Sequence, residues 1–156
     1  ADENIRRILH LNTEEKRVFL LKRLRCGDHK PIMIETSYIP YDLCRGIEKH
    51  DFTVCSLYQV LDEEYAMKVE HATEIIAAIL IRESDARLLK CKSREAGYQI
   101  RRISETKIGT IIEYTTSVTR ADMCEFQIEL YESDKHNQQK TNVARNISFA
   151  NHKADK

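Results

Sequence analysis

Two arginines and a carboxylate near the start of the sequence are the side chains best suited to binding chemistry. Arg23 and Arg25 are two positions apart, so in an extended strand both point to the same face. If the next five residues, Cys26–Lys30, form a hairpin loop, Met33 and Glu35 of the returning strand share that face. Two guanidinium groups and a carboxylate then converge, and guanidinium forks suit the oxygens of a phosphate or a carboxylate.

A second candidate lies at the start of a predicted helix. Ser56 and Gln59 have the Ser-x-x-Gln spacing of a capping box. The N-terminus of a capped helix presents free N–H groups and the positive end of the helix dipole, which together form a common anion site. We therefore expect an anionic group to bind between the arginines and Ser56.

Each of these residues also has a purely structural interpretation. The two arginines could pair with Glu35 or Glu113 on a solvated sheet face. Ser56 caps its helix whether or not it touches a ligand, and Tyr58 could be a core aromatic on the first helical turn. Glu113, on an alternating strand, could be a solvated carboxylate. The residue types alone leave both interpretations open.

The elements that must position these side chains are a hairpin and a helix, and the sequence predicts both. We expect strands over residues 16–25 and 31–39, ended by Pro40, and a helix that begins at Ser56. Other expected elements are helices over 3–11 and 84–89, strands over 98–104, 110–119 and 124–131, and a polar segment from residue 132 in which 147–149 docks as a stray strand. Residues 67–82 fit a buried helix or a buried strand.

Strands joined by short turns, with helices inserted between hairpins, indicate an α+β domain built on an antiparallel sheet. The strands over 98–131 are expected to form a second meander, and no internal repeat is visible. Gly-rich nucleotide loops and the common signatures of hydrolases and zinc enzymes are absent from the sequence. We therefore expect no catalytic residue.

The composition describes one domain without net charge. The chain has 156 residues, 42% hydrophobic and 32% charged, with 25 basic and 25 acidic side chains. A chain of this length buries about 70% of its unfolded surface, which supports one core and excludes disorder of the whole chain. Because nucleic-acid-binding modules usually carry a net basic surface, we expect DNA to be contacted only by another segment.

The cysteines favour a reducing compartment such as the cytoplasm. Their number, five, is odd, and no two form a Cys-x-x-Cys pair, so we expect no metal site and no cofactor. The longest apolar run, Ile75–Ile81, is far shorter than the ~18 residues of a membrane span. We expect no membrane contact. The chain opens at Ala1, as a domain cut from a longer protein would.

One ordered set of residues resembles a known family. The set comprises Arg23-Leu24-Arg25, Asp28, Pro31, Glu35, Tyr38, Pro40, Ser56-Leu57-Tyr58, Ala86, Leu89, Arg102, Gly109, Glu113-Tyr114, Arg120, Asp122 and Phe126. In this order and spacing it resembles the UTRA domain, the effector-binding domain of HutC-type GntR transcriptional regulators.

The resemblance implies a chorismate-lyase-like fold, with the ligand-binding domain at residues 1–131 and a polar tail at 132–156. It implies a homodimer that senses an effector for a bacterial repressor, whose winged helix-turn-helix domain, outside this sequence, contacts operator DNA. Family effectors are small anionic metabolites, often hexosamine 6-phosphates. The expected ligand-binding residues are Arg23, Arg25, Glu35, Ser56, Tyr58 and Glu113, while Arg120 and Asp122 are assigned to a strand-end turn.

Two other functions stay open at this point. A lyase-type enzyme is one, since chorismate lyase shares the fold and fold does not determine function. A dimerisation module without a ligand is the other, with Arg23 and Arg25 as solvated charges. Product analysis distinguishes an enzyme from a sensor, and thermal shifts with a metabolite panel distinguish a sensor from a ligand-free module.

Overall fold

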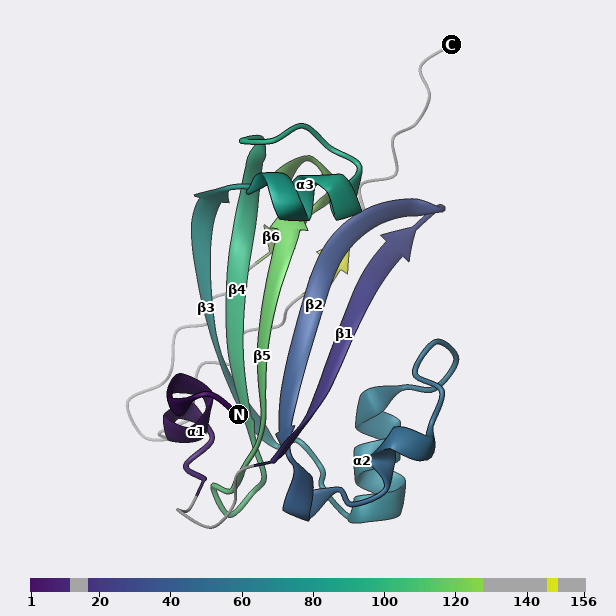
Figure 1. Ribbon diagram of the computed structural model, residues 1–156, viewed down its shortest axis with the longest axis vertical. Helices are drawn as coiled ribbons and strands as arrows, with labels where there is room; N and C mark the ends of the chain where they lie inside the picture. Colours follow the sequence, from purple (N-terminus) through teal and green to yellow (C-terminus); the bar gives the residue numbers. More distant parts are fainter. Residues whose placement is uncertain (12–16, 128–145, 149–156) are drawn as a thin grey trace, which may run out of the picture.

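The computed structural model describes residues 1–11, 17–127 and 146–148, and its centre is one antiparallel sheet (Figure 1). The sheet contains β1 (Val18–Gly27), β2 (Lys30–Pro40), β3 (His71–Leu80), β4 (Ala96–Glu105) and β5 (Ile111–Arg120), in the spatial order β1-β2-β5-β4-β3. Inserted between them are α1 (Glu3–Ile8), α2 (Leu57–Tyr65), α3 (Glu83–Leu89) and the 3-10 turns η1 (Tyr41–Leu43), η2 (Ile47–Lys49) and η3 (Ala121–Met123). The expected α+β class is confirmed.

Helices pack on both faces of the sheet. α3 packs on Ile34 and Val118, which are paired across β2 and β5. α1 packs on Tyr38 and Tyr114, which are paired on the same face, and Figure 1 views the sheet from this side. α2 packs around Ile39 on the opposite face. Because Arg23 and Glu35 have the parity of Ile39 along the paired strands, the candidate side chains share the face of α2.

The order of elements occurs twice along the chain. α1, β1, β2 and η1 follow one another, and α3, β4, β5 and η3 repeat that order, with β2 beside β5 at the centre. Thr36 lies directly opposite Thr116, so an approximate two-fold axis through this pair relates the two halves. The sequence analysis found no repeat because identical residues at this offset are scattered, among them Thr36 and Thr116 in the central strands and Asp42 and Asp122 in the two 3-10 turns.

The β1–β2 hairpin has a tighter turn than the five-residue loop Cys26–Lys30, so that expectation is wrong. Strand pairing continues to Gly27 and Lys30, and the connection is the two residues Asp28 and His29. Their φ angles are +47° and +61°. Positive φ at both central residues is what the two-residue hairpin turn requires, because it matches the twist of the flanking strands.

The expected common face of the hairpin residues is confirmed despite the shorter turn. Arg23 pairs directly with Glu35, and Arg25 pairs with Met33. A register shift between Arg25 and Cys26 accommodates an extra residue near the turn. The two arginines of β1 and the Glu35 carboxylate of β2 therefore lie on the same face of the hairpin.

The last strand of the expected second meander does not join the main sheet. β6 (Glu125–Gln127) pairs instead with β7 (Asn146–Ser148) in a separate two-stranded sheet. The cause is the 3-10 turn η3, which follows β5 and redirects the chain. β7 agrees with the stray strand expected near residue 147, whereas residues 128–131 of the expected strand lie outside the described residues.

Two further expectations about elements are settled. Residues 67–82, which fitted a helix or a strand, contain β3, and β3 pairs with β4 along its whole length.

The first helix ends at Ile8 rather than near residue 11, because Leu9 leaves helical geometry and His10 takes a φ of +52°. A positive φ at a residue with a side chain interrupts a right-handed helix.

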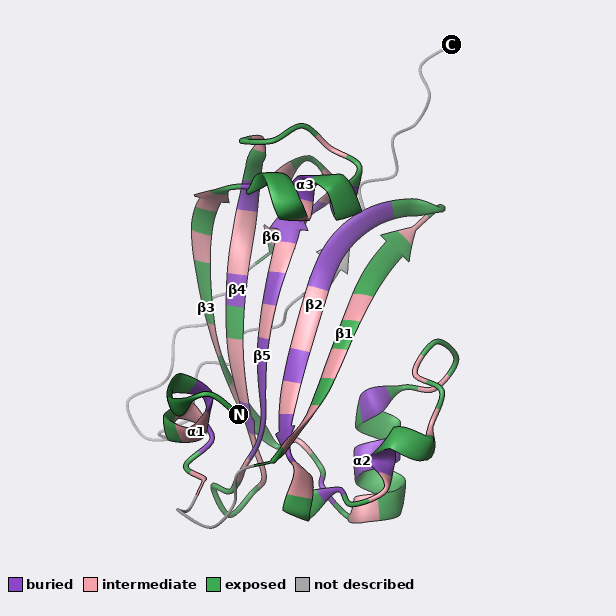
Figure 2. Cartoon of the chain, in the orientation of Figure 1, coloured by how far each residue is buried: buried purple, intermediate pink, exposed green. Residues whose placement is uncertain are grey.

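An irregularity at the start of β5 places two consecutive side chains toward α2. Ser104 pairs with Glu113 and Glu105 pairs with Ile111, which leaves Ile112 as an extra residue. Ile112 is fully buried in the cluster beneath α2. Figure 2 shows that burial is concentrated in β2 and β5, while the edge strands β1 and β3 contain only intermediate and exposed residues. The central pair of strands is therefore the scaffold of the core.

Replacing Gly97 with alanine is expected to destabilise the sheet by about 1–3 kcal/mol, because overpacking a close contact costs that much. A Cβ at this position would lie 2.7 Å from Ile81 Cγ1 and 2.8 Å from the backbone oxygen of Thr119. Urea unfolding measures the effect. Substituting serine for the exposed neighbour Ala96 is the control, and equal stability of the two variants would contradict the prediction.

Candidate ligand-binding site

A large cavity lies on the sheet face that α2 covers. Its volume is about 1040 Å³, and its walls come from β1, β2, β4 and β5, from Glu74 of β3, and from residues 48 and 50–58, which include the start of α2. All six residues predicted to bind a ligand line this cavity: Arg23, Arg25, Glu35, Ser56, Tyr58 and Glu113. The fold thus brings together side chains from three strands and the start of one helix.

Arg23 and Glu35 form an ion pair on the cavity wall. Arg23 Nη2 donates to Glu35 Oε1, and the two side chains are only 18% and 21% exposed. The Arg23 Nε–H is buried and has no partner among the described residues. Because an unsatisfied buried donor costs about 1–3 kcal/mol, the pair does not fully satisfy this guanidinium, and an acceptor oxygen beside it would.

Glu113 is a buried carboxylate that joins α2 to the sheet. It is 1% exposed, and its Oε2 accepts hydrogen bonds from the Tyr58 hydroxyl at 2.7 Å and from Ser104 Oγ at 3.1 Å. A buried carboxylate is tolerated when hydrogen bonds replace its hydration. The two donors come from α2 and β4, so the carboxylate fixes the position of both elements at the cavity floor.

The environment of Tyr58 keeps its hydroxyl protonated. Burial raises the pKa of Tyr58 far above its usual range, and the neighbouring Glu113 carboxylate raises it further. The residue is 38% exposed as a whole, but the oxygen that titrates is the part that contacts the buried carboxylate. Tyr58 is therefore a neutral hydrogen-bond donor at physiological pH.

Arg102 is a cavity residue that the sequence analysis did not propose as a ligand contact. It lies opposite Thr115 in β4, as Arg23 lies opposite Glu35 in β1, so the two arginines occupy related positions in the two halves. Its guanidinium carbon lies 5.4 Å from the centre of the Tyr58 ring.

Arg102 is also held by polar neighbours. Its Nε donates to Ser104 Oγ at 3.2 Å, and its Nη1 lies 3.7 Å from Glu74 Oε1. Glu74, Ser104 and His50 were likewise not proposed. The sequence did contain one indication of Arg102, because Arg102 and Ser104 are two positions apart and so share one face of their strand. The correspondence of Arg102 with Arg23, however, depends on the order of strands in the sheet.

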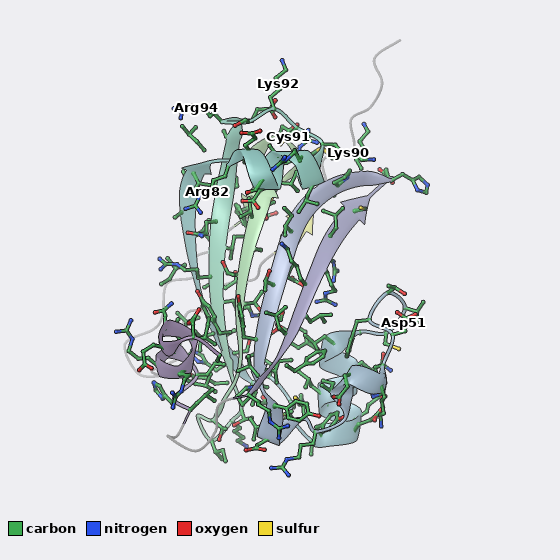
Figure 3. All side chains as sticks on the ribbon, in the orientation of Figure 1. Asp51, Arg82, Lys90, Cys91, Lys92 and Arg94 are labelled. Atoms are coloured by element: carbon green, nitrogen blue, oxygen red, sulfur yellow. The ribbon has the colours of Figure 1, made fainter. Side chains whose placement is uncertain are left out.

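Arg25 is a cavity cation that remains open to a ligand. It lines the cavity and forms no ion pair within the described part of the chain. Among the acidic lining residues, Asp51 accepts from Thr53 N and Oγ1 at 2.9 and 2.6 Å. Figure 3 shows Asp51 in the loop before α2, whereas Arg82, Lys90, Lys92 and Arg94 surround α3 at the far end. The basic residues at the α3 end do not line the cavity.

Ser56 is the N-cap of α2, as expected. Its Oγ accepts from Gln59 N at 3.5 Å, and the Gln59 side chain donates to Glu63 at 2.9 Å. Ser56 is exposed and lines the cavity. The first turn of α2 therefore opens toward the same space as Arg23 and Arg25.

Two other groups singled out in the sequence are the Arg120–Asp122 pair and the cysteines. Arg120 donates to Asp122 Oδ1 at 2.9 Å at the end of β5, as the assignment to a strand-end turn expected. The five cysteines are free thiols, and Cys26 and Cys55 line the cavity. In the described ranges, no three metal-ligating side chains cluster, and no helix is long and apolar enough to cross a membrane.

The UTRA domain family matches residues 1–125, which include the whole five-stranded sheet and every residue of the cavity wall. The chain belongs to the UTRA domain family. The resemblance of the ordered residue set is thereby confirmed.

Relatives of this UTRA domain are bacterial transcription regulators. Over 86 residues it is 26% identical to the HTH-type transcriptional regulator YurK of Bacillus subtilis strain 168, a match that covers 55% of this chain and 36% of that protein. The chain thus spans about a third of the length of this curated relative.

Two solved structures share the fold of this UTRA domain. A GntR-family regulator from Enterococcus faecalis V583 is 27% identical with a TM-score of 0.75, covering 83% of this chain and 91% of that one. The ligand-binding domain of a GntR-family regulator from Bordetella bronchiseptica is 25% identical with a TM-score of 0.72, covering 78% and 77%. The chain is accordingly an effector-binding domain of the GntR-regulator type.

Replacing Tyr58 with phenylalanine is expected to lower the free energy of unfolding by about 1–3 kcal/mol at pH 7, because a buried carboxylate loses a donor. The folded-state pKa of Tyr58 lies above the unfolded value. Its contribution is therefore complete below pH ~10 and declines as the pH rises further. The gap between wild type and variant should narrow above that pH in urea titrations.

The alanine variant of Ser104 is the control, because it removes the other donor to Glu113 without removing a titratable group. Its deficit in unfolding free energy should stay constant over the same alkaline range. A Tyr58→Phe gap that is equally constant would contradict the assigned pKa shift.

Proposed function

We propose that this UTRA domain is the effector-sensing and dimerisation domain of a HutC-type transcription repressor, and that it binds a small anionic metabolite. The observation that carries the proposal is the convergence of all six predicted residues on one cavity. About 1040 Å³ is at the upper end of the range of small-molecule sites, so a phosphorylated monosaccharide fits.

The groups that line the cavity support a ligand with an anionic group and with hydrogen-bond donors. Arg25 makes no ion pair within the described residues, and the start of α2 at Ser56 offers backbone donors, so an anionic group binds beside them. Glu35 and Glu113 provide carboxylate oxygens that accept from hydroxyl or amino groups. A hexosamine 6-phosphate has both kinds of group, and we favour it.

The proposed regulator controls DNA through a domain outside this sequence. Residues 1–131 form the ligand-binding unit and 132–156 its tail, and a winged helix-turn-helix contacts the operator. Two copies pair, so that a ligand in each cavity changes the spacing or orientation of two DNA-binding heads. The balance of 25 basic and 25 acidic side chains agrees with a domain that does not itself bind DNA.

A role in sensing rather than in catalysis agrees with the relatives, which are regulators. The raised pKa of Tyr58 is also far from neutral pH, whereas a general acid or base works best with a pKa near the working pH. Incubation with glucosamine 6-phosphate followed by mass spectrometry tests whether the domain has catalytic activity. Formation of any product would favour the alternative of a lyase-type enzyme.

Ser56 offers a test that separates helix capping from ligand binding. Ser56→Ala removes the cap and is expected to cost about 1 kcal/mol of stability. Ser56→Asp keeps the cap and adds a negative charge where the anion is expected. The aspartate variant should therefore unfold like wild type, yet bind glucosamine 6-phosphate at least ~10-fold more weakly than the alanine variant, as like charges repel.

Isothermal titration calorimetry with glucosamine 6-phosphate and with uncharged glucosamine makes the measurement. Equal affinities of the two Ser56 variants for the phosphorylated sugar would place the anion elsewhere. The thermal shift of wild type with the same two sugars shows whether the phosphate group contributes to binding.

Arg25→Ala is expected to weaken the binding of glucosamine 6-phosphate about 10-fold, because a charged hydrogen bond contributes roughly 1.5 kcal/mol or more. Arg25→Lys should recover part of the loss, since an ammonium lacks the bidentate fork of arginine. Arg101→Ala is the matched control, because Arg101 is an exposed cation that does not line the cavity. An Arg25→Ala protein that binds like the Arg101→Ala protein would exclude Arg25 from the site.

A further inference from the structure

β1 lines the cavity in a different way from the other strands. β2, β4 and β5 contribute only alternate residues, such as Met33 and Glu35 of β2, because one face of each strand meets the cavity. β1 contributes every residue from 19 to 26. Side chains on both faces of a strand border one space only if that space extends around the edge of the strand. The cavity therefore opens along the outer edge of β1.

The backbone of this edge is available for pairing. β1 is the first strand in the sheet order and pairs only with β2. Apart from that pairing, no backbone hydrogen bond within the described ranges involves residues 18–27. A row of open N–H and C=O groups is a template for another extended chain. In Figure 1, α2 and the loop before it lie beyond β1, on the side away from β2, so the edge faces the cavity.

The side chains along this edge are basic and apolar. β1 carries Lys22, Arg23 and Arg25 and contains no acidic residue. Lys22 and Arg25 are exposed, and neither forms an ion pair within the described part of the chain. Leu20 and Leu24 are 53% and 45% exposed on the same face of β1 as Lys22. A strand with carboxylates opposite the two cations and an apolar residue opposite Leu24 complements this edge.

The acidic residues of the facing cavity wall are bonded to neighbours other than β1. Glu48 accepts from the Tyr41 hydroxyl at 2.8 Å, and Asp51 accepts from Thr53 N at 2.9 Å. The exposed cations of β1 are therefore available to carboxylates that come from another molecule.

We propose that the outer edge of β1 binds an extended acidic peptide, which adds to the five-stranded sheet as a sixth strand. In this mode of recognition, main-chain hydrogen bonds supply affinity and side chains at alternate positions supply specificity. The edge along residues 19–26 is roughly 25 Å long at ~3.3 Å per residue, which suits a peptide of several residues and exceeds one sugar ring. The proposal does not rest on the proposed function.

The probe is the capped peptide acetyl-Glu-Val-Thr-Glu-Val-amide. In antiparallel pairing it places one carboxylate opposite Arg25 and the other opposite Lys22. Isothermal titration calorimetry with the complete chain should give a dissociation constant below ~1 mM. The matched peptide with glutamine in place of both glutamates should bind at least ~10-fold more weakly, because hydrogen bonds between charged groups are the stronger ones. Absence of binding at this concentration would refute the proposal.

Methylation of the peptide backbone distinguishes strand pairing from contact through side chains alone. In an antiparallel edge pair, alternate peptide N–H groups point toward β1 and the others point away. One probe is N-methylated at its first, third and fifth residues, and another at its second and fourth. One of the two should lose binding while the other retains it, and equal affinities would contradict pairing along the edge.

Lys22→Glu tests the charge of the edge. Like charges across an interface cost several kcal/mol, so the variant should bind the peptide at least ~10-fold more weakly. Arg101→Glu is the matched control, because Arg101 is exposed on β4 and does not line the cavity. It should bind the peptide like wild type. Equal affinities of the two variants for the peptide would exclude Lys22 from the interface and overturn the proposed register.

Amide hydrogen exchange followed by NMR shows whether the edge is free. Alternate amides of β1 should exchange rapidly in the chain alone and slowly with the peptide bound, because pairing protects them. Slow exchange of every β1 amide without the peptide would mean that this chain or a second copy already covers the edge. That result would reject the peptide as its occupant.

Calorimetry with glucosamine 6-phosphate on the same proteins separates this proposal from the proposed function. Lys22→Glu should leave the affinity for the sugar phosphate unchanged. A wild type that binds the peptide and no sugar phosphate keeps the strand-pairing site and rejects the effector. A wild type that binds only the sugar phosphate keeps the effector and rejects the strand-pairing site.

Discussion

The buried carboxylate of Glu113 is the constraint on which the cavity depends. A charge taken out of water is costly unless hydrogen bonds replace its hydration, so α2 must dock where the Tyr58 hydroxyl reaches the carboxylate and β4 must present Ser104. The irregularity at Ile112 makes this possible, because it buries an apolar side chain beneath α2 and leaves Glu113 at the cavity. The helix, the sheet irregularity and the cavity wall are thus consequences of one polar contact.

The hairpin shows why part of the site was predictable from sequence. A five-residue loop would place Arg25 opposite Pro31, and the observed turn places it opposite Met33. The tighter turn changes the register by one residue, and the register shift between Arg25 and Cys26 adds a second. Because side chains in a strand alternate with a period of two, the combined change of two leaves each residue on its face. The loop length was wrong while the grouping of Arg23, Arg25 and Glu35 was right. The grouping held because the irregularity beside the turn offset the change in loop length.

Contacts that depend on the order of strands in the sheet could not be predicted from the pattern of residue types. Arg102 meets Glu74 only because β4 lies between β3 and β5, and it corresponds to Arg23 only through the axis between the central strands. The extra residue Ile112 leaves no mark in the pattern of residue types. The prediction that β6 continues the second meander was wrong for a related reason. The short 3-10 turn that redirects the chain contains no proline or glycine by which the sequence would indicate a turn.

The two-fold relation of the halves has a consequence for molecular recognition. Related positions on either side of the axis have diverged: Arg25 opposite Met33 in one half corresponds to Ser104 opposite Glu113 in the other. Repeated halves whose corresponding residues differ in charge make the cavity wall asymmetric. A molecule bound in the cavity would therefore meet different groups in its two orientations. The divergence of the halves is thus a physical basis for recognising the direction of a small molecule as well as its shape.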